Sequence, residues 1–214
     1  MELTDLQNKH KGETVWVLGS GPSLNHIDAG FFSGKTVIST NFSAESLGFE
    51  AHYVFSHYHH VIAQLLPSDI TTFVTLQCDT LSHKPWAGHV PEKVLFAEQD
   101  SYSAPGGAWN PLTSHKPKQG SLTYGSSSLH GAMHLAAHLG ASYIILVGAD
   151  CGTLDGSHRV DTYQVKNGHT PWALYEKHHR LMKQYLQETY GVKVHSLNPF
   201  INLNLEGHTF EGVS

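Results

Sequence analysis

Short apolar, β-branched runs alternate along the chain with stretches in which apolar residues recur at helical spacing. Runs of this length and composition are typical of strands buried on both faces of a sheet. The predicted strands cover residues 14–18, 36–40, 53–55, 71–76, 94–96, 143–147 and 192–197. The predicted helices cover residues 24–32, 44–47, 57–66, 126–139 and 171–190.

The alternation of strand and helix predicts an α/β fold, Rossmann-like, with a mainly parallel sheet and helices on both faces. A chain of 214 residues suits a single domain, here residues 1–214, with a sizeable core. Two segments interrupt the alternation, at about 100–125 and 151–170. Both follow strands, so we expect them at the carboxyl edge of the sheet, where ligands bind in such folds, as a lid and an active-site loop.

Composition and charge argue against several classes of protein. The formal net charge is 13 − 18 = −5, and no basic run stands out, which argues against a nucleic-acid partner. No stretch of about 18 apolar residues and no leader-like start is present, so the sequence predicts a soluble, cytoplasmic protein without an integral membrane segment. Cys78 and Cys151 are far apart and outside any CxxC pair, which predicts free thiols.

The first predicted strand runs into a glycine turn that is followed by a helical stretch. Glycines permit a tight turn and a close approach of backbone, and amides at a helix start attract phosphate. This position therefore predicts nucleotide binding by the turn, with a purely structural turn as the alternative. No Lys-Ser/Thr pair follows, so the turn is not a Walker A loop, and Leu24 replaces the third glycine of a dinucleotide fingerprint. The turn residues are Gly19, Ser20, Gly21, Pro22 and Ser23.

The second and third strands end in further polar residues. Asn41 stands where a NAD-binding domain places an acid, and its amide suits a sugar hydroxyl or a base edge; a cap or turn residue is the equal alternative. His57 is expected to line a ligand pocket. It opens a histidine cluster, but neighbouring residues on a helix point in different directions and no His-Glu-x-x-His pattern exists, so we predict no metal site.

The helix predicted at 126–139 begins with three serines, and Ser127 and Ser128 would form a second anion cradle or a sugar-binding edge. His130, His134 and His138 follow at a spacing of four, which predicts a half-exposed polar stripe rather than a metal site.

Two further candidates follow the next strand. Asp150 ends it at the ligand edge, where it would contact substrate, bind a metal or cap the loop. His169 precedes the last helix, and a histidine there can act as a general base near neutral pH; a surface histidine is the alternative.

In this order the motifs resemble those of the bacterial sialyltransferases of the lipooligosaccharide type and, more distantly, of the 6-hydroxymethylpterin diphosphokinase-like proteins. The resemblance spans roughly residues 16–199. It rests on the Gly-x-Gly-Pro-Ser-Leu opening at 19–24, on Asn41, on the serine helix and strand at 126–150, on Gly-His-Thr at 168–170 and on the closing strand at 192–199.

The resemblance implies an inverting glycosyltransferase that takes a cytidine-monophosphate sugar and a saccharide acceptor, on an α/β fold, and requires no metal or other cofactor. It implies nucleotide contacts at Gly21, Pro22, Ser23, Asn41, His57, Ser127 and Ser128, and a proton acceptor at His169. Two family tyrosines that assist the leaving phosphate match Gly152 and His158 here, so His158 or the adjacent Arg159 would supply that chemistry. Ser20 also replaces a family asparagine.

Two alternatives stay open. A pterin-type diphosphokinase would need magnesium held by carboxylates, and the third strand ends in Ser56 and His57 instead, although Asp150 and Asp155 could compensate. A non-catalytic nucleotide- or sugar-binding protein on the same fold fits the missing tyrosines. Leu24 and Asn41 make a NAD enzyme less favoured, and a homo-oligomer is left open.

Overall fold

Eight parallel strands form one sheet at the centre of the computed structural model, which describes residues 2–70, 72–76, 91–100, 109–113, 120–125, 127–151 and 172–197. The strand order is β6-β5-β4-β3-β2-β1-β7-β8, and every neighbouring pair is parallel. The strands are β1 Thr14–Leu18, β2 Thr36–Thr40, β3 Tyr53–Phe55, β4 Thr72–Leu76, β5 Val94–Asp100, β6 Ser121–Thr123, β7 Tyr143–Val147 and β8 Lys193–Leu197.

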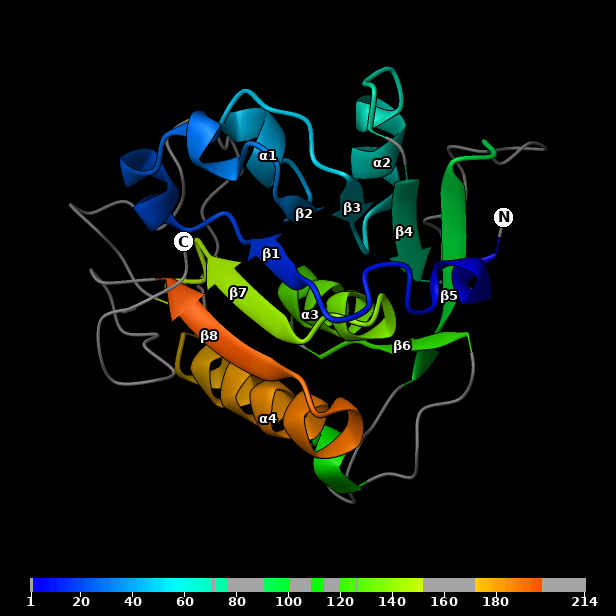
Figure 1. Ribbon diagram of the computed structural model, residues 1–214, viewed down its shortest axis with the longest axis vertical. Coiled ribbons are helices and arrows are strands. Elements are labelled where there is room, and N and C mark those ends of the chain that lie inside the picture. The colour runs from blue at the N-terminus through cyan, green and yellow to red at the C-terminus, as the bar shows by residue number, and fades with distance from the viewer. Residues whose placement is uncertain are drawn as a thin grey trace.

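Helices cover both faces of this sheet, as the sequence predicts (Figure 1). The α-helices are α1 Ser43–Ser46, α2 His59–Leu65, α3 Ser128–His138 and α4 Trp172–Tyr190. The short 3-10 helices are η1 Leu3–Leu6, η2 Pro22–His26, η3 Ala29–Phe32 and η5 Pro111–Thr113. In Figure 1, α1 and α2 lie above β1, β2 and β3, α3 lies below these strands, and α4 lies below β8.

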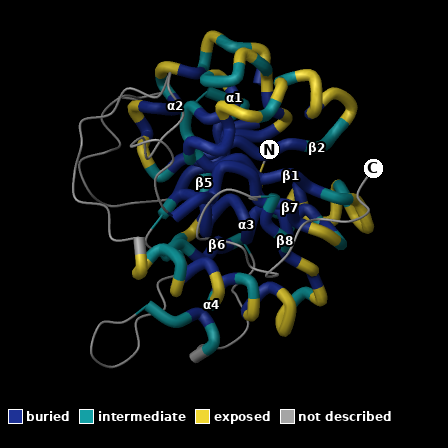
Figure 2. Tube along the Cα trace, turned by 90° about the vertical axis from the view of Figure 1, so that its left-hand side faces the viewer, coloured by how far each residue is buried: buried dark blue, intermediate teal, exposed yellow. Residues whose placement is uncertain are grey.

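Strand alternation explains why two layers of helices are needed. In β1, Val15 and Val17 pack in the cluster that holds the buried side chains of α3 and α4. Trp16 and Leu18, which point to the opposite face, pack with apolar residues of η2, η3 and α1. Both faces of the central strands are therefore buried, and Figure 2 shows buried chain through the sheet and α3.

The predicted helix at 24–32 is wrong, because this stretch forms the two short helices η2 and η3. Ile27 has φ −120° and ψ 123°, and Asp28 has φ −70° and ψ 138°, so both are extended. The Asp28 carboxylate accepts a hydrogen bond of 2.6 Å from the Gly30 amide, which caps η3. This cap makes the start of a new helix at η3 more favourable than a continuation of η2.

The expected loop at about 100–125 contains structure that the sequence did not predict. β5 extends to Asp100, and β6 pairs with it through Ser121, Leu122 and Thr123, all three buried. β6 has the sequence Ser-Leu-Thr, in which one apolar residue stands between two hydroxyl residues, so it lacks the apolar run from which the other strands are predicted. Residues 101–108 and 114–119 of this segment, and residues 152–170 of the second predicted loop, lie outside the described residues.

Two of the three histidines of the α3 stripe, His130 and His134, are buried rather than half-exposed, which corrects the prediction for them, whereas His138 is partly exposed. His130 and His134 are 0% and 1% exposed. His134 accepts a 2.7 Å hydrogen bond from the Thr123 amide of β6, and its other ring nitrogen lies 2.6 Å from the Tyr190 hydroxyl of α4. His138 bonds the Leu3 carbonyl at 2.8 Å. The polar stripe therefore joins α3 to its neighbours inside the core.

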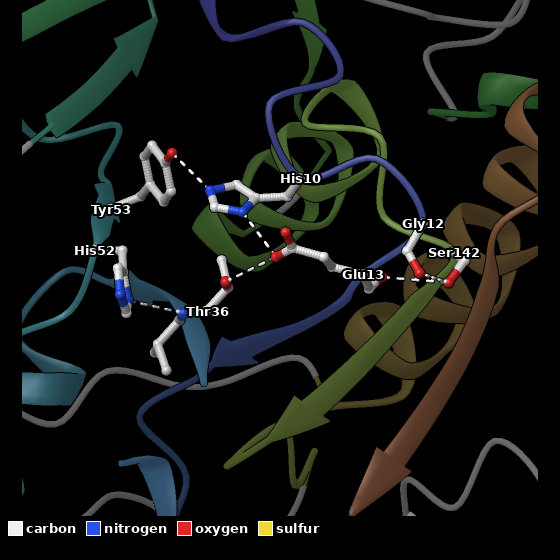
Figure 3. Close-up of polar contacts among 8 residues, drawn as sticks. His10, Gly12, Glu13, Thr36, His52, Tyr53 and Ser142 are labelled. Atoms are coloured by element: carbon white, nitrogen blue, oxygen red, sulfur yellow. Dashed lines mark hydrogen bonds and ion pairs between the residues drawn. The ribbon is translucent and has the colours of Figure 1, made fainter. Parts of the chain in front are cut away.

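At the amino edge of the sheet, a second polar network fastens the segment before β1 (Figure 3). His10 lies 2.8 Å from the Glu13 carboxylate and 2.9 Å from the Tyr53 hydroxyl. Thr36 donates to the same carboxylate at 3.2 Å, and Ser142 donates to the Gly12 carbonyl at 2.7 Å. These contacts tie the starts of β1, β2, β3 and β7 together.

Two further observations concern predictions made from the sequence. Cys151 is a buried free cysteine, as expected, and burial raises the pKa of its thiol to about 12; Cys78 lies outside the described residues. In the part of the chain that the structure describes, no helix combines the length and the apolar character needed to cross a bilayer.

The buried histidines predict that acid destabilises the fold. Burial lowers the pKa of His134 to about 3 and that of His179 in α4 to about 4, whereas a histidine in the unfolded chain titrates near 6.5. The unfolded chain binds these protons first, so the stability that the neutral rings provide is complete above about pH 6.5 and is lost as the pH falls towards the folded values. We expect each ring to add a slope of about 1.4 kcal/mol per pH unit in that window.

Urea unfolding between about pH 7.5 and pH 4.5 measures this slope. The His134→Gln variant should have a slope lower than that of the wild type by the contribution of one histidine. The control, His60→Gln, changes an exposed residue of α2 and should leave the slope as it is. Equal slopes for His134→Gln and the wild type would show that His134 is not buried in its neutral form.

Candidate functional site

The strand order reverses its direction of progression between β1 and β7, so the carboxyl ends of these two strands form the topological switch point of the sheet. The chain leaves β1 towards η2 on one face of the sheet, and it leaves β7 towards α4 on the other. Adjacent parallel strands whose connections diverge in this way mark the point where open α/β sheets bind ligands. The turn at 19–23 and the segment 148–151 lie on the two sides of this point.

These two segments pack against each other through their backbones. The Gly19 amide donates to the Val147 carbonyl and the Gly21 amide donates to the Gly148 carbonyl, each at 2.7 Å. A Cβ at Gly19 would lie 2.4 Å from the Gly148 oxygen, and a Cβ at Gly21 would lie 2.4 Å from the Asp150 carboxylate. Both glycines are required by this close approach, whatever ligand the site takes.

Asp150 occupies the position where the sequence predicts a bound phosphate. Its Oδ2 accepts a hydrogen bond of 2.7 Å from the Ser23 amide at the start of η2. With the bonds of Gly19 and Gly21, three amides of the turn donate to protein acceptors. η2 is also a 3-10 helix of five residues rather than the predicted longer helix, so its dipole is small. Binding of a nucleotide by Gly19, Ser20, Gly21, Pro22 and Ser23 stays a prediction.

The Asp150 carboxyl group is buried and only half hydrogen-bonded. Asp150 is 3% exposed and Ser23 is 1% exposed, and neither Oδ1 of the aspartate nor Oγ of the serine has a hydrogen-bond partner. Burial raises the pKa of Asp150, and the amide and the nearby hydroxyl of Ser23 act in the opposite direction. Because a buried polar atom without a partner is costly, this pair has unused binding capacity.

Asn41 follows β2 in a conformation that favours short polar residues. Its φ of +52° lies in the left-handed region, which asparagine tolerates better than most side chains. Its Oδ1 accepts a hydrogen bond of 2.7 Å from Ser56 Oγ, and Ser56, which follows β3, is fully buried. Ser56 Oγ in turn accepts from the Tyr58 amide at 3.0 Å. The side-chain amide of Asn41 is therefore held in place by Ser56, which follows the neighbouring strand β3.

The structure brings His57 together with the start of α3. The His57 ring stacks on Tyr124, with centroids 4.6 Å apart and planes 17° from parallel. Nδ1 of His57 is buried and has no hydrogen-bond partner. Ser127 forms the capping box of α3 with His130, whose Nδ1 accepts from the Ser127 amide at 3.3 Å. Burial and the neighbouring His59 lower the pKa of His57, so the ring is neutral at pH 7. Ser128 begins α3, whose first amides have no acceptor within the helix.

Several candidates lie outside the described residues, namely His158, Arg159 and His169, and with them Gly152, Asp155 and Ser126. Their roles stay predictions. The sequence analysis treats Ser56 only as a residue that stands in place of a carboxylate, and it does not select Tyr124. Ser56 directly follows a predicted strand, and that position was the available signal; Tyr124 follows β6, which the sequence did not predict.

A surface hollow of about 360 Å³ lies along α4. The residues that line it are Ala173, Glu176, Lys177, Arg180, Leu181 and Gln184, none of which the sequence analysis selected.

Comparison with known proteins supports the fold. No protein-family profile matches the chain, and no curated protein matches its sequence. Among solved structures, the fold is similar to that of the MAf glycosyltransferase from Magnetospirillum magneticum AMB-1, with a TM-score of 0.57 and 13% sequence identity. The match covers 96% of this chain and 36% of that chain, so this chain spans little more than a third of the neighbour's length. At this identity the likeness shows an α/β, Rossmann-like fold.

The contact between the two segments predicts that a methyl group at position 21 is destabilising. In the Gly21→Ala variant, the new carbon would collide with the Asp150 carboxylate and with the Gly148 carbonyl at 2.6 Å. We expect a loss of about 1–3 kcal/mol in the free energy of unfolding, measured by urea denaturation. The neighbouring Ser20→Ala variant adds no atom and should stay within about 0.5 kcal/mol of the wild type. Equal stability of both variants would contradict the close approach.

Proposed function

We propose that the protein is a glycosyltransferase that takes a nucleotide-activated sugar as donor and a saccharide as acceptor. The observation that carries this proposal is the set of buried polar atoms without partners on residues that follow the strands at the carboxyl edge. They belong to residues that the sequence selected independently: Ser23, His57 and Asp150. Polar groups that the protein leaves unsatisfied at a ligand edge favour a polar ligand such as a nucleotide sugar.

Two further arguments support the same activity. One solved structure with a similar fold is that of a glycosyltransferase. The motifs resemble those of the bacterial lipooligosaccharide sialyltransferases, which favours a cytidine-monophosphate sugar as donor and inversion at the anomeric carbon. Neither argument fixes the acceptor, which is proposed only as a saccharide hydroxyl.

The proposed reaction is a direct displacement. The acceptor oxygen attacks the anomeric carbon, the bond from that carbon to the phosphate oxygen breaks, and cytidine monophosphate leaves. His169 takes the proton of the attacking hydroxyl, and His158 or Arg159 donates hydrogen bonds to the leaving phosphate. Asn41, His57, Ser127 and Ser128 hold the nucleotide together with the turn at 19–23. No metal is required in this scheme.

Calorimetric titration with cytidine monophosphate and a transfer assay test the proposal together. In the His169→Ala variant, turnover should fall by at least about a hundredfold, because a general base contributes 10²–10⁴ in rate. Affinity for cytidine monophosphate should stay within about twofold, since the base acts on the acceptor.

The control is His60→Ala, which removes an exposed histidine of α2 and should change neither quantity. Unchanged turnover in His169→Ala would remove the role of this histidine. A wild-type protein that binds no nucleotide over a panel of cytidine, uridine and adenine nucleotides would contradict the function as a whole.

A further inference from the structure

The turn after β1 differs in charge from a phosphate cradle. A cradle offers free amide donors at a helix start, but here the Ser23 amide donates to Asp150 Oδ2 at 2.7 Å, and the Gly19 and Gly21 amides donate to carbonyls of the β7 segment. A phosphate at this turn would lie beside the Asp150 carboxylate, and two anions at such a distance repel each other. The Asp150 carboxylate therefore occupies the place that a bound phosphate would take at this turn.

What remains available at this position is a pair of hydrogen-bonding atoms. Asp150 Oδ1 accepts, Ser23 Oγ both donates and accepts, and both atoms are buried without partners. The hydroxyl lies near enough to the carboxyl group to lower its pKa, yet makes no hydrogen bond of normal geometry. The hydrogen bond from the Ser23 amide to Asp150 Oδ2 holds these two residues in a fixed relation to each other.

This pair matches two neighbouring hydroxyl groups. One hydroxyl donates to the carboxylate oxygen, and the second exchanges a hydrogen bond with the serine hydroxyl, so that neither buried atom stays unsatisfied. We propose that Asp150 and Ser23 form the subsite for the vicinal hydroxyls of the nucleotide's ribose, at the carboxyl ends of β1 and β7. This inference rests on the proposed function, because it takes the ligand to be a ribonucleotide.

The subsite predicts a preference for ribonucleotides that depends on Asp150. We expect the wild type to bind cytidine monophosphate about tenfold or more tightly than its 2′-deoxy or 3′-deoxy analogue, since a hydrogen bond to a buried charged group is among the stronger ones. In Asp150→Asn, the Ser23 amide keeps an oxygen acceptor but the charge is gone. The preference should then fall to about threefold or less.

Calorimetric titration of the three nucleotides against the wild type, Asp150→Asn, Ser23→Ala and Asp28→Asn measures this dependence, with thermal melts to confirm that each variant is folded. Ser23→Ala keeps the backbone bond to Asp150 and should lower the preference for one of the two hydroxyl positions. Asp28→Asn is the matched control, because Asp28 is an exposed carboxylate of the same loop that caps η3. Its preference should equal that of the wild type.

Three results would overturn the inference without touching the proposed function. The first is equal binding of all three nucleotides by the wild type. The second is tighter binding of all three by Asp150→Asn with no preference, as a phosphate at the turn would require. The third is wild-type binding that depends on magnesium through Asp150. Failure of the wild type to bind any nucleotide would instead contradict the proposed function itself.

Discussion

The close contact between the backbone after β1 and the backbone after β7 is the constraint on which the candidate site depends. Two hydrogen bonds of 2.7 Å, from Gly19 and Gly21 to the carbonyls of Val147 and Gly148, bring the segments together. The contact requires residues without a side chain at positions 19 and 21, because a Cβ at either would lie 2.4 Å from an oxygen of the β7 segment. Once the segments are this close, Asp150 can reach the Ser23 amide.

The same contact changes what the glycine turn can bind. Glycines at the first strand-to-helix turn usually indicate phosphate binding, because such a turn leaves its amides free. In this fold the glycines serve the approach of β7, and the amides are used inside the protein. The two edges of the sheet differ accordingly. His10, Glu13 and Tyr53 satisfy one another at the amino edge, whereas Asp150 and Ser23 each keep an unused atom at the carboxyl edge.

Most of the fold could be predicted from the sequence because its strands are buried on both faces. Four strands, β1, β2, β3 and β7, begin and end at the predicted residues. Continuous apolar runs bounded by polar residues leave little choice of where such a strand begins and ends. β6 was missed because its Ser-Leu-Thr sequence has a single apolar residue, and η2 and η3 were merged because the Asp28 cap is a local side-chain contact. The buried histidines of α3 were taken as half-exposed because a stripe at helical spacing does not reveal what packs against it.

The candidate site was predictable in position but not in detail. The sequence places Asn41, His57 and Asp150 after strands, and parallel strands carry such residues to one edge. Pairings across the chain, such as Ser56 with Asn41 over 15 positions and Ser23 with Asp150 over 127, need the folded structure. These pairings decide which atoms face a ligand, and therefore which ligand chemistry the site favours.

A crystal structure of the protein with cytidine monophosphate tests the central claim most directly. The account predicts ribose hydroxyls within about 3.2 Å of Asp150 Oδ1 and Ser23 Oγ, with the phosphate away from the turn at 19–23. A phosphate bound on the amides of that turn, with Asp150 displaced from Ser23, would contradict it.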